Sequence, residues 1–284
     1  MMQTFQQTTA YFTGSNGFNI FYRSFSAAKE KARLVIAHGL GEHSGRYERV
    51  VQRLVAQGIS VWALDFCGHG QSDGRRGHIE SFDQYIADLD KLIDKAAEGA
   101  SQQMRIFLLG HSLGGLIALN YALRFPDKLN GLVVSSPVLA SKVKIPPFKK
   151  MLGQVMSAIW PGLSMSNELD PTKISHDPSV VDAYIQDPLV HNRVTARWFT
   201  EFVSAMAWVQ KSVTKMKTPI LMQIAGNDFL VDAGASETFF NHLQLKDKTI
   251  HIYTELFHEI FNETADESTT VLDDLHAWIE MHLW

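Results

Sequence analysis

The chain has 284 residues, of which 45% are hydrophobic and 20% are charged, and a formal net charge of −4. Its composition is that of a soluble globular protein, and its length favours one large α/β domain with an insertion. The charge argues against nucleic acid as a partner, and the single cysteine, Cys67, excludes an internal disulfide and a cysteine-based zinc cluster. Because neither a signal peptide nor an apolar run of about 18 residues is visible, we expect a cytoplasmic protein.

Strands and helices alternate in the first half of the chain. Two short strands, 11–13 and 18–22, flank Gly-Ser-Asn-Gly and predict a β-hairpin. Apolar strands are then expected at 34–37, 61–64 and 106–109. Helices are expected over 47–54, from the capping box at 81–84 onwards, and over 113–125.

The second half continues this alternation after one interruption. Strands are expected at 131–134, 220–224 and 249–253. Helices are expected at 235–243 and from a second capping box at 264–267 towards the end of the chain. Short apolar strands alternating with helices imply a mostly parallel central sheet with helices on both faces.

The interruption is a segment of about 80 residues between Pro137 and Ile220, far more than a crossover connection needs. We therefore expect a helical cap of residues 138–210, inserted into a core of residues 1–137 and 211–284.

Two runs of the expected cap, 148–160 and 198–206, keep the spacing of amphipathic helices, and Asp-Pro pairs between them mark turns. The apolar faces of these helices have two interpretations. They either pack on the core, or they line a pocket for an acyl chain or contact a membrane surface.

The sequence Gly110-His111-Ser112-Leu113-Gly114 lies between an expected strand and an expected helix. In this context G-x-S-x-G is the pattern of a nucleophile elbow, a sharp turn that lifts a serine hydroxyl clear of the sheet. The two glycines fit such a turn, because neighbouring backbone approaches closely there. The pattern alone is weak, since it arises by chance in about one chain of this length in ten at ordinary residue frequencies. Ser112 is therefore a candidate nucleophile whose partners have to be found.

A serine nucleophile needs a base within hydrogen-bond reach and an acid that orients the base. In folds with a nucleophile elbow these partners follow in the order serine, acid, histidine. Asp228 and His258 each follow an expected strand, at the edge of the sheet where Ser112 also emerges and where ligands bind. The sequence thus predicts a triad of Ser112, His258 and Asp228, with Asp232 as the rival acid.

An oxyanion hole should complete such a site, with one donor expected from the backbone N–H of Leu113, after the nucleophile. We expect the second from Leu40 in the loop after the strand at 34–37, because flanking glycines let the backbone turn inward. Two histidines of this loop, His38 and His43, have no convincing third ligand, so no metal site is expected.

Three motifs stand out together: 38–47 (HGLGEHSGRY), 65–78 (DFCGHGQSDGRRGH) and 110–115 (GHSLGG). They resemble the monoacylglycerol lipases and the related lysophospholipases. The resemblance implies a cofactor-free α/β-hydrolase that cleaves the ester of a single-chain lipid. It also implies Glu42 and Arg46 as substrate-binding candidates at the polar end of the pocket, although an ion pair explains them equally well.

The predicted function is a serine carboxylester hydrolase that cleaves the fatty-acyl ester of a monoacylglycerol or lysophospholipid through an acyl-enzyme. The cap adds the expectation of transient contact with a membrane surface, and the oligomeric state is left open. Alternatives on the same triad are a small-ester esterase, an acyltransferase or a prolyl aminopeptidase. A non-catalytic interaction protein is a further alternative, against which the intact triad argues. One departure from some family members is Phe261, where they have a second histidine three residues after the catalytic one.

Overall fold

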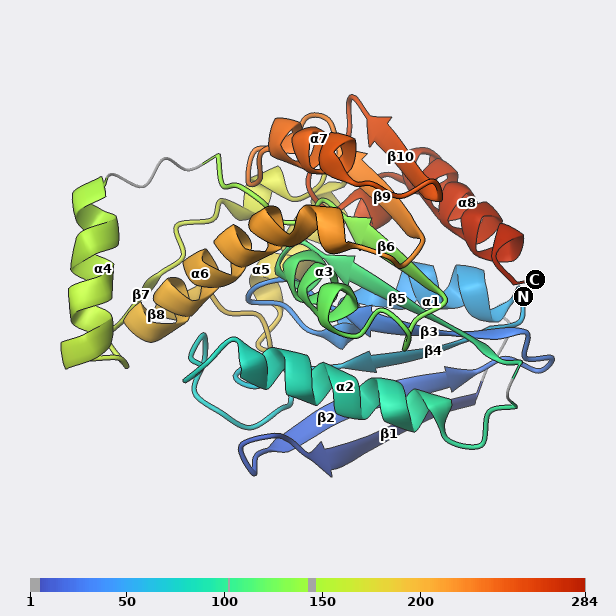
Figure 1. Ribbon diagram of the computed structural model, residues 1–284, viewed down its shortest axis with the longest axis horizontal. Helices are drawn as coiled ribbons and strands as arrows, with labels where there is room; N and C mark the ends of the chain where they lie inside the picture. Colours follow the sequence, from blue (N-terminus) through green and yellow to red (C-terminus); the bar gives the residue numbers. More distant parts are fainter. Residues whose placement is uncertain (1–5, 102, 143–146, 284) are drawn as a thin grey trace.

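A twisted sheet forms the centre of the molecule (Figure 1). The computed structural model describes residues 6–101, 103–142 and 147–283, without the side chains of residues 147–152. Within these residues the main sheet has eight strands in the order β1-β2-β4-β3-β5-β6-β9-β10. β2 is antiparallel to β1 and β4, and the strands from β4 to β10 are parallel, as predicted. Their bounds are β1 (Gln6–Thr13), β2 (Asn19–Ser26), β3 (Ala32–Ala37), β4 (Ile59–Leu64), β5 (Arg105–His111), β6 (Gly131–Ser135), β9 (Ile220–Ala225) and β10 (Lys248–Tyr253).

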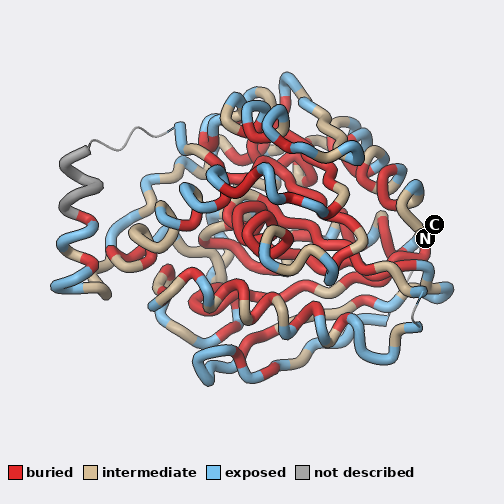
Figure 2. The backbone as a smooth tube through the Cα atoms, in the orientation of Figure 1, coloured by how far each residue is buried: buried red, intermediate tan, exposed pale blue. Residues whose placement is uncertain are grey.

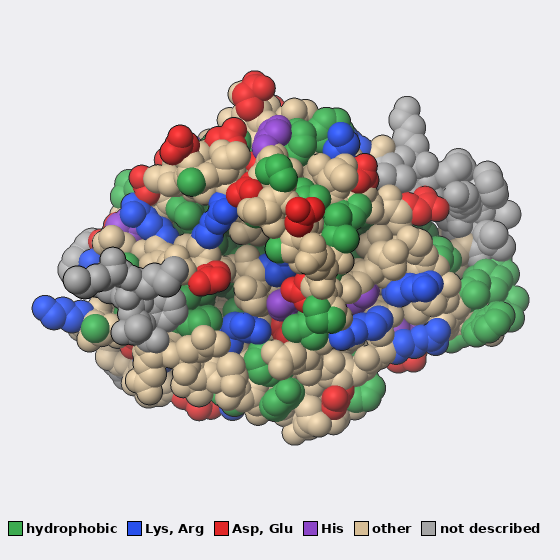
Figure 3. All heavy atoms as spheres, turned by 180° about the vertical axis from the view of Figure 1, so that it is seen from behind, with side chains coloured by type: hydrophobic (Ala, Val, Ile, Leu, Met, Phe, Trp, Pro, Cys, Tyr) green, Lys and Arg blue, Asp and Glu red, His purple; other side chains and the backbone are tan. Residues whose placement is uncertain are grey.

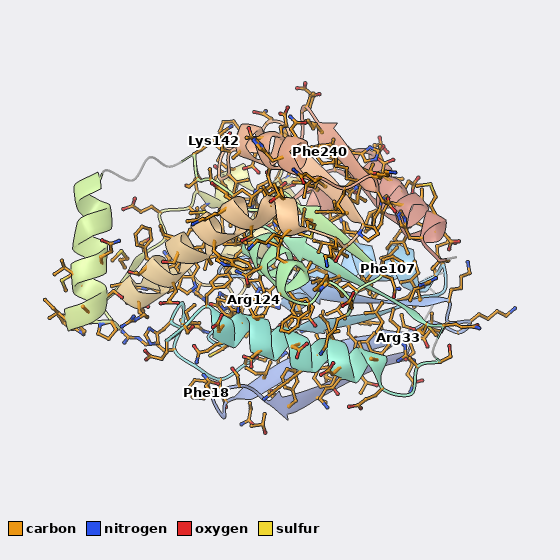
Figure 4. All side chains as sticks on the ribbon, in the orientation of Figure 1. Phe18, Arg33, Phe107, Arg124, Lys142 and Phe240 are labelled. Atoms are coloured by element: carbon orange, nitrogen blue, oxygen red, sulfur yellow. The ribbon has the colours of Figure 1, made fainter. Side chains whose placement is uncertain are left out.

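Helices cover both faces of the sheet, which confirms the predicted class. α2 (Asp83–Ala97), α3 (Leu113–Arg124), α6 (Ala196–Ser212) and α7 (Ala233–His242) pack on one face, and α1 (Glu48–Val55) and α8 (Ala265–Met281) on the other. In β3, Val35 contacts the first group and Leu34 the second, because successive side chains of a strand point to opposite faces. Figure 2 shows the buried residues concentrated along these strands, and Phe107 of β5 lies among them (Figure 4). Burial on both faces explains why the strands have continuous apolar sequences.

The segment between β6 and β9 carries the elements of the expected cap. They are α4 (Pro147–Ile159), β7 (Ser164–Ser166), α5 (Pro178–Gln186) and β8 (Arg193–Thr195), before α6 leads back to the core. β7 and β8 pair with each other, and α4 stands at one end of the molecule (Figure 1, left). The described residues also form short 3-10 helices at Ser44–Tyr47 (η1), Pro171–Lys173 (η2), Val213–Lys215 (η3) and Ile260–Asn262 (η4). The division into a core of 1–137 and 211–284 and a cap of 138–210 stays our proposal, with its second boundary inside α6.

The two amphipathic runs predicted for the cap pack in different ways. On α6, Trp198 is buried and donates through Nε1 to the hydroxyl of Tyr85 on α2 at 3.0 Å. α4 packs on α6 through the buried Gly153, whereas Ile159 and Trp160 are 75% and 61% exposed. The side chains of the first part of this run lie outside the described residues. No helix that the structure describes combines the length and apolarity needed to cross a membrane.

Two Asp-Pro pairs that were predicted as turns begin helical segments instead. Asp170 accepts a hydrogen bond from the Thr172 N–H at 3.0 Å at the start of η2, and Asp177 accepts one from the Ser179 N–H at 3.0 Å at the start of α5. Aspartate is a good helix N-cap, and a proline that follows it fits the first helical position. The turn predictions are wrong because an Asp-Pro pair fits the start of a helix as well as a turn. In α5 the apolar residues also have helical spacing: Val180, Val181, Tyr184 and Ile185.

Candidate active site

Ser112 occupies the turn between β5 and α3 with a φ of 54° and a ψ of −115°. A non-glycine residue is strained in this region, and such strain concentrates at functional sites. A Cβ on Gly110 would clash with the backbone of Gly114, and a Cβ on Gly114 would clash with the backbone of Ala37. The predicted elbow is therefore a turn whose flanking positions require glycine.

Backbone hydrogen bonds hold this turn from three sides. The Ser112 N–H donates to the carbonyl of Ser135 in β6 at 2.9 Å. The Ser112 carbonyl accepts from the N–H groups of Leu116 in α3 and Val138 after β6, each at 3.1 Å. The strand, the helix and the start of the expected cap therefore fix the backbone that carries the hydroxyl.

Asp228 and His258 form a buried pair on the loops after β9 and β10. The Oδ2 of Asp228 lies 2.6 Å from the Nδ1 of His258, and its Oδ1 accepts from the N–H groups of Leu230 and Val231 at 2.8 and 3.0 Å. The Asp228 carbonyl accepts from Lys142, which lies after β6 (Figure 4). Burial alone would raise the pKa of Asp228, but the charge of His258 and these hydrogen bonds lower it. Burial alone would lower the pKa of His258, but the charge and hydrogen bond of Asp228 raise it above the ordinary 6.5.

Ser112 and His258 line one cavity of about 360 Å³. No hydrogen bond joins the Ser112 hydroxyl to His258 in the part of the chain that the structure describes. Catalytic hydrogen bonds are often long before substrate binds. The ring of His111 packs on that of His258 with centroids 4.7 Å apart, and burial lowers the pKa of His111 to about 4, which keeps it neutral. Ser112 and His258 thus line the same cavity, and Asp228, which is not in its lining, contacts His258. Their action as a triad stays a prediction.

The loop after β3 lies directly beside the serine. A Cβ on Gly39 would be 3.4 Å from the Cβ of Ser112, and Leu40 lines the cavity. Among the described residues, neither the Leu40 N–H nor the Leu113 N–H donates to another protein group. Both N–H groups can therefore bind a ligand oxygen, and their role as an oxyanion hole stays a prediction.

Glu42 holds this loop in place. Its Oε1 accepts from the Gly39 N–H at 2.6 Å and from the Tyr47 hydroxyl at 2.8 Å, and its Oε2 accepts from Arg46 at 3.1 Å. Burial alone would raise the pKa of Glu42, but chiefly the charge of Arg46 lowers it to about 2. Glu42 is thus a buried anion, and it also lines the cavity.

Arg46 is engaged by protein groups on all sides. Its Nη1 and Nη2 donate to the two oxygens of Glu259 at 2.6 and 2.8 Å, and its guanidinium lies 4.6 Å from the centroid of the Tyr184 ring. Glu259 lines the cavity, whereas Arg46 does not. Glu42 and Arg46 form the ion pair that the sequence analysis gave as the alternative to substrate binding. Contact of either residue with substrate stays a prediction. Sequence reasoning missed Glu259, because one acid beside a histidine forms no motif.

Other candidate residues have different surroundings. Asp232 is exposed and caps α7 by accepting from the Gly234 N–H at 2.9 Å. Phe261 is buried in the core cluster that includes α8, away from the cavity. His38 is fully buried, and its Nε2 accepts from the Phe66 N–H at 2.9 Å. Each of these side chains is accounted for by its protein neighbours.

The outer wall of the cavity comes from η2, α5 and the loops of the expected cap, and none of the side chains described in α4 or α6 lines it. These residues are Asn167, Leu169, Asp170, Pro171, Ile174, Tyr184, Ile185, Asp187, Val190, His191 and Asn192. The whole lining includes four carboxylates and, among the described residues, no lysine or arginine. The carboxylates are Glu42, Asp170, Asp187 and Glu259.

One group of side chains has the spacing of metal ligands. The ligand atoms of His176, Glu263 and Glu267 lie within 4.8 Å of one another. Both oxygens of Glu263 accept hydrogen bonds from protein groups, and Glu267 accepts one from the Thr264 hydroxyl at 2.6 Å. Protein hydrogen bonds explain this group, so we assign no metal to it.

The parallel sheet, the strained serine after β5 and the buried Asp–His pair define the α/β-hydrolase class. Within that class, the chain belongs to the serine aminopeptidase (S33) family of serine hydrolases, which matches residues 28–265.

The relatives within this class include lipases. The monoacylglycerol lipase of Mycolicibacterium smegmatis is 33% identical over 274 residues, which cover 96% of each chain. The crystal structure of the Paleococcus ferrophilus monoacylglycerol lipase has a TM-score of 0.84 and 34% identity, and the match covers 99% of this chain and 100% of that one. An uncharacterised abhydrolase-domain protein of Dictyostelium discoideum is 36% identical over 259 residues, and this chain spans 27% of its length. The resemblance and the fold predicted from the sequence are confirmed.

Proposed function

We propose that the protein hydrolyses the fatty-acyl ester of single-chain lipids through an acyl-enzyme, with Ser112 as nucleophile, His258 as base and Asp228 as the group that orients the base. The observation that carries this proposal is the 2.6 Å Asp228–His258 pair at a cavity that a strained elbow serine shares. Relatives named monoacylglycerol lipase and phospholipase support the choice of substrate.

In the first half of this reaction, His258 takes the proton of the Ser112 hydroxyl as its oxygen attacks the ester carbonyl carbon. The N–H groups of Leu40 and Leu113 stabilise the resulting oxyanion. His258 then gives the proton to the leaving alcohol. In the second half, His258 removes a proton from water as the water oxygen attacks the acyl carbon of the acyl-enzyme. The bond from that carbon to the Ser112 oxygen then breaks, His258 returns the proton to Ser112, and the fatty acid leaves.

The charge of the cavity bears on the headgroup of the lipid. The carboxylates of Glu42 and Glu259 lie next to the candidate catalytic residues and share the one positive charge of Arg46, and Asp170 and Asp187 lie in the outer wall. The four carboxylates therefore outnumber this compensating charge. Carboxylates accept hydrogen bonds from glycerol hydroxyls, whereas like charges repel a phosphate. The lining therefore favours a monoacylglycerol over a lysophospholipid.

Matched lipids test this preference. We expect kcat/KM for a monoacylglycerol to exceed that for the anionic lysophosphatidylglycerol with the same acyl chain by at least about tenfold, since like-charge contact costs several kcal/mol. A preference for the phospholipid would contradict the headgroup assignment. A preference for short esters or for a prolyl amide would contradict the lipid assignment, and transfer of the acyl group to an added alcohol in place of water would favour an acyltransferase.

We also propose that the exposed face of α4 makes transient contact with a lipid surface. Hydrophobic side chains gather at this end of the molecule (Figure 3), where Val155, Ile159 and Trp160 are exposed. A substrate that resides in membranes gives this face an occupant, and amphipathic helices bind such surfaces through buried apolar area.

Vesicle binding tests the contact. We expect wild type to sediment with phosphatidylcholine vesicles that contain monoacylglycerol, and I159D/W160D to lose most of this binding while its hydrolysis of a soluble nitrophenyl ester stays unchanged. The double substitution W208D/M281D removes exposed apolar side chains elsewhere and serves as the control. Equal sedimentation of wild type and I159D/W160D would contradict the proposal.

A further inference from the structure

A buried carboxylate outside the candidate triad holds the loop that carries His258. Glu263 is fully buried, and its Oε1 accepts from the backbone N–H of Phe257, the residue before His258, at 2.6 Å. Its Oε2 accepts from the backbone N–H of His176, in the expected cap, at 2.6 Å. One side chain thus joins the histidine loop to the segment before α5.

Further bonds reinforce this connection from the cap side. The His176 ring lies with Nδ1 3.0 Å from Oε1 of Glu263, and the Ser175 hydroxyl lies 3.0 Å from Oε2. The residue after His258, Glu259, donates its N–H to the carbonyl of Ile174 at 2.8 Å. The segment 174–176 is therefore bound to the chain on both sides of His258, directly at Glu259 and through Glu263 at Phe257.

The contacts of Glu263 indicate a specific role in joining two segments of the chain. A buried carboxylate is costly unless several donors satisfy it, and here two backbone N–H groups at 2.6 Å do so. Aromatic contacts connect the same two segments. The ring centroids of His176 and Phe257 are 3.6 Å apart, and Phe257 contacts Phe229 edge-on with centroids 5.1 Å apart. Phe229 and Phe257 are the direct neighbours of Asp228 and His258 in sequence, so a ring of the expected cap packs on the residue before His258.

We propose that Glu263 is a positioning residue: it locks the His258 loop to segment 174–176, so that the imidazole is aligned between Asp228 and Ser112 only when the cap is docked. This inference rests on the proposed function, because it takes His258 as the base. Ile174 also lines the cavity, so the docked segment contacts the substrate that the base acts on.

Glu263→Gln tests the proposal, because the amide has the same size but only one oxygen that accepts hydrogen bonds. Its NH2 group replaces the other oxygen and faces the protein donors that this oxygen served. We expect kcat per active site for a soluble ester to fall at least about tenfold with KM nearly unchanged, since small displacements of catalytic groups cost large factors in rate. Active sites are counted by titration with a fluorophosphonate probe. Glu267→Gln removes a neighbouring carboxylate that does not touch the histidine loop, and it should behave as wild type.

The pH profile separates positioning from a purely structural role. A looser Asp228–His258 contact lowers the pKa of His258, so the acid limb of kcat/KM should move to lower pH in Glu263→Gln. Loss of folded protein would reduce the number of titrated sites and leave the profile in place. A wild-type profile and wild-type kcat per site would overturn the proposal.

A second variant keeps the test decisive if Glu263→Gln does not fold. His176→Ala removes a ring that is 36% exposed from the cap side, and we expect a smaller loss of kcat per site with a shift of the acid limb in the same direction. No change in either quantity would overturn the proposal. His258→Ala distinguishes this outcome from failure of the proposed function, because an active His258→Ala enzyme would mean that His258 is not the base.

Discussion

Ser112→Ala is expected to lower kcat for a nitrophenyl ester by about 10⁴-fold or more, as loss of a nucleophile does in serine hydrolases of this type. The strained backbone at Ser112 accepts alanine no worse than serine, so the fold should be kept and the thermal unfolding midpoint should stay close to that of wild type. Ser204, an exposed serine of α6, provides the matched control, and Ser204→Ala should leave kcat unchanged.

The outcome distinguishes the enzyme from its alternatives. Equal rates in wild type and Ser112→Ala would mean that another group performs the reaction. Absence of hydrolysis in wild type, on any ester or amide tested, would support a non-catalytic interaction protein.

Asp228→Asn is expected to lower kcat by about 10⁴-fold, because an amide keeps the shape of the side chain but no longer stabilises the imidazolium or its tautomer. In wild type, Asp228 raises the pKa of His258 above 6.5, and the base must be neutral to act. Activity should therefore fall as the pH drops through that raised pKa. In Asp228→Asn burial still lowers the pKa of His258, so the residual activity should persist to lower pH.

The rival acid supplies the control for this experiment. Asp232 is exposed and caps α7, so Asp232→Asn should change kcat by less than about twofold, as expected for a surface substitution away from the reaction. A large loss in Asp232→Asn together with a small one in Asp228→Asn would reverse the assignment of the acid. Both variants are compared over the full pH range, so that a shifted profile is not mistaken for a loss of activity.

The sheet comes from strong local signals, and the elbow pattern becomes informative because it lies between an expected strand and an expected helix. Apolar strands that are buried on both faces are recognisable, and the glycines around Ser112 have a steric reason that the structure makes explicit. Asp228 and His258 were found because each follows a strand at one edge of a parallel sheet, where the fold brings distant residues together.

The walls of the cavity could not be predicted in the same way. The runs in α4 and α6 have similar apolar spacing, yet Trp198 is buried against α2 while Trp160 is exposed, because spacing does not reveal what a helix packs against. The cavity instead uses residues between 167 and 192, most of which lie in loops that have no apolar period, together with Tyr184 and Ile185 of α5. Glu259 and Glu263 have their roles through contacts with Arg46 and with segment 174–176, which are remote in sequence.

The central claim is that Ser112 forms the acyl-enzyme in a reaction with a single-chain lipid ester. Its most direct test is mass spectrometry of the protein after reaction with a fluorophosphonate probe, followed by peptide mapping. We predict a single adduct on Ser112, whose formation a monoacylglycerol slows and which is absent from Ser112→Ala. Two results would contradict the account. One is a protein that hydrolyses a monoacylglycerol although the probe forms no adduct on Ser112, and the other is a protein that remains fully active once Ser112 is labelled.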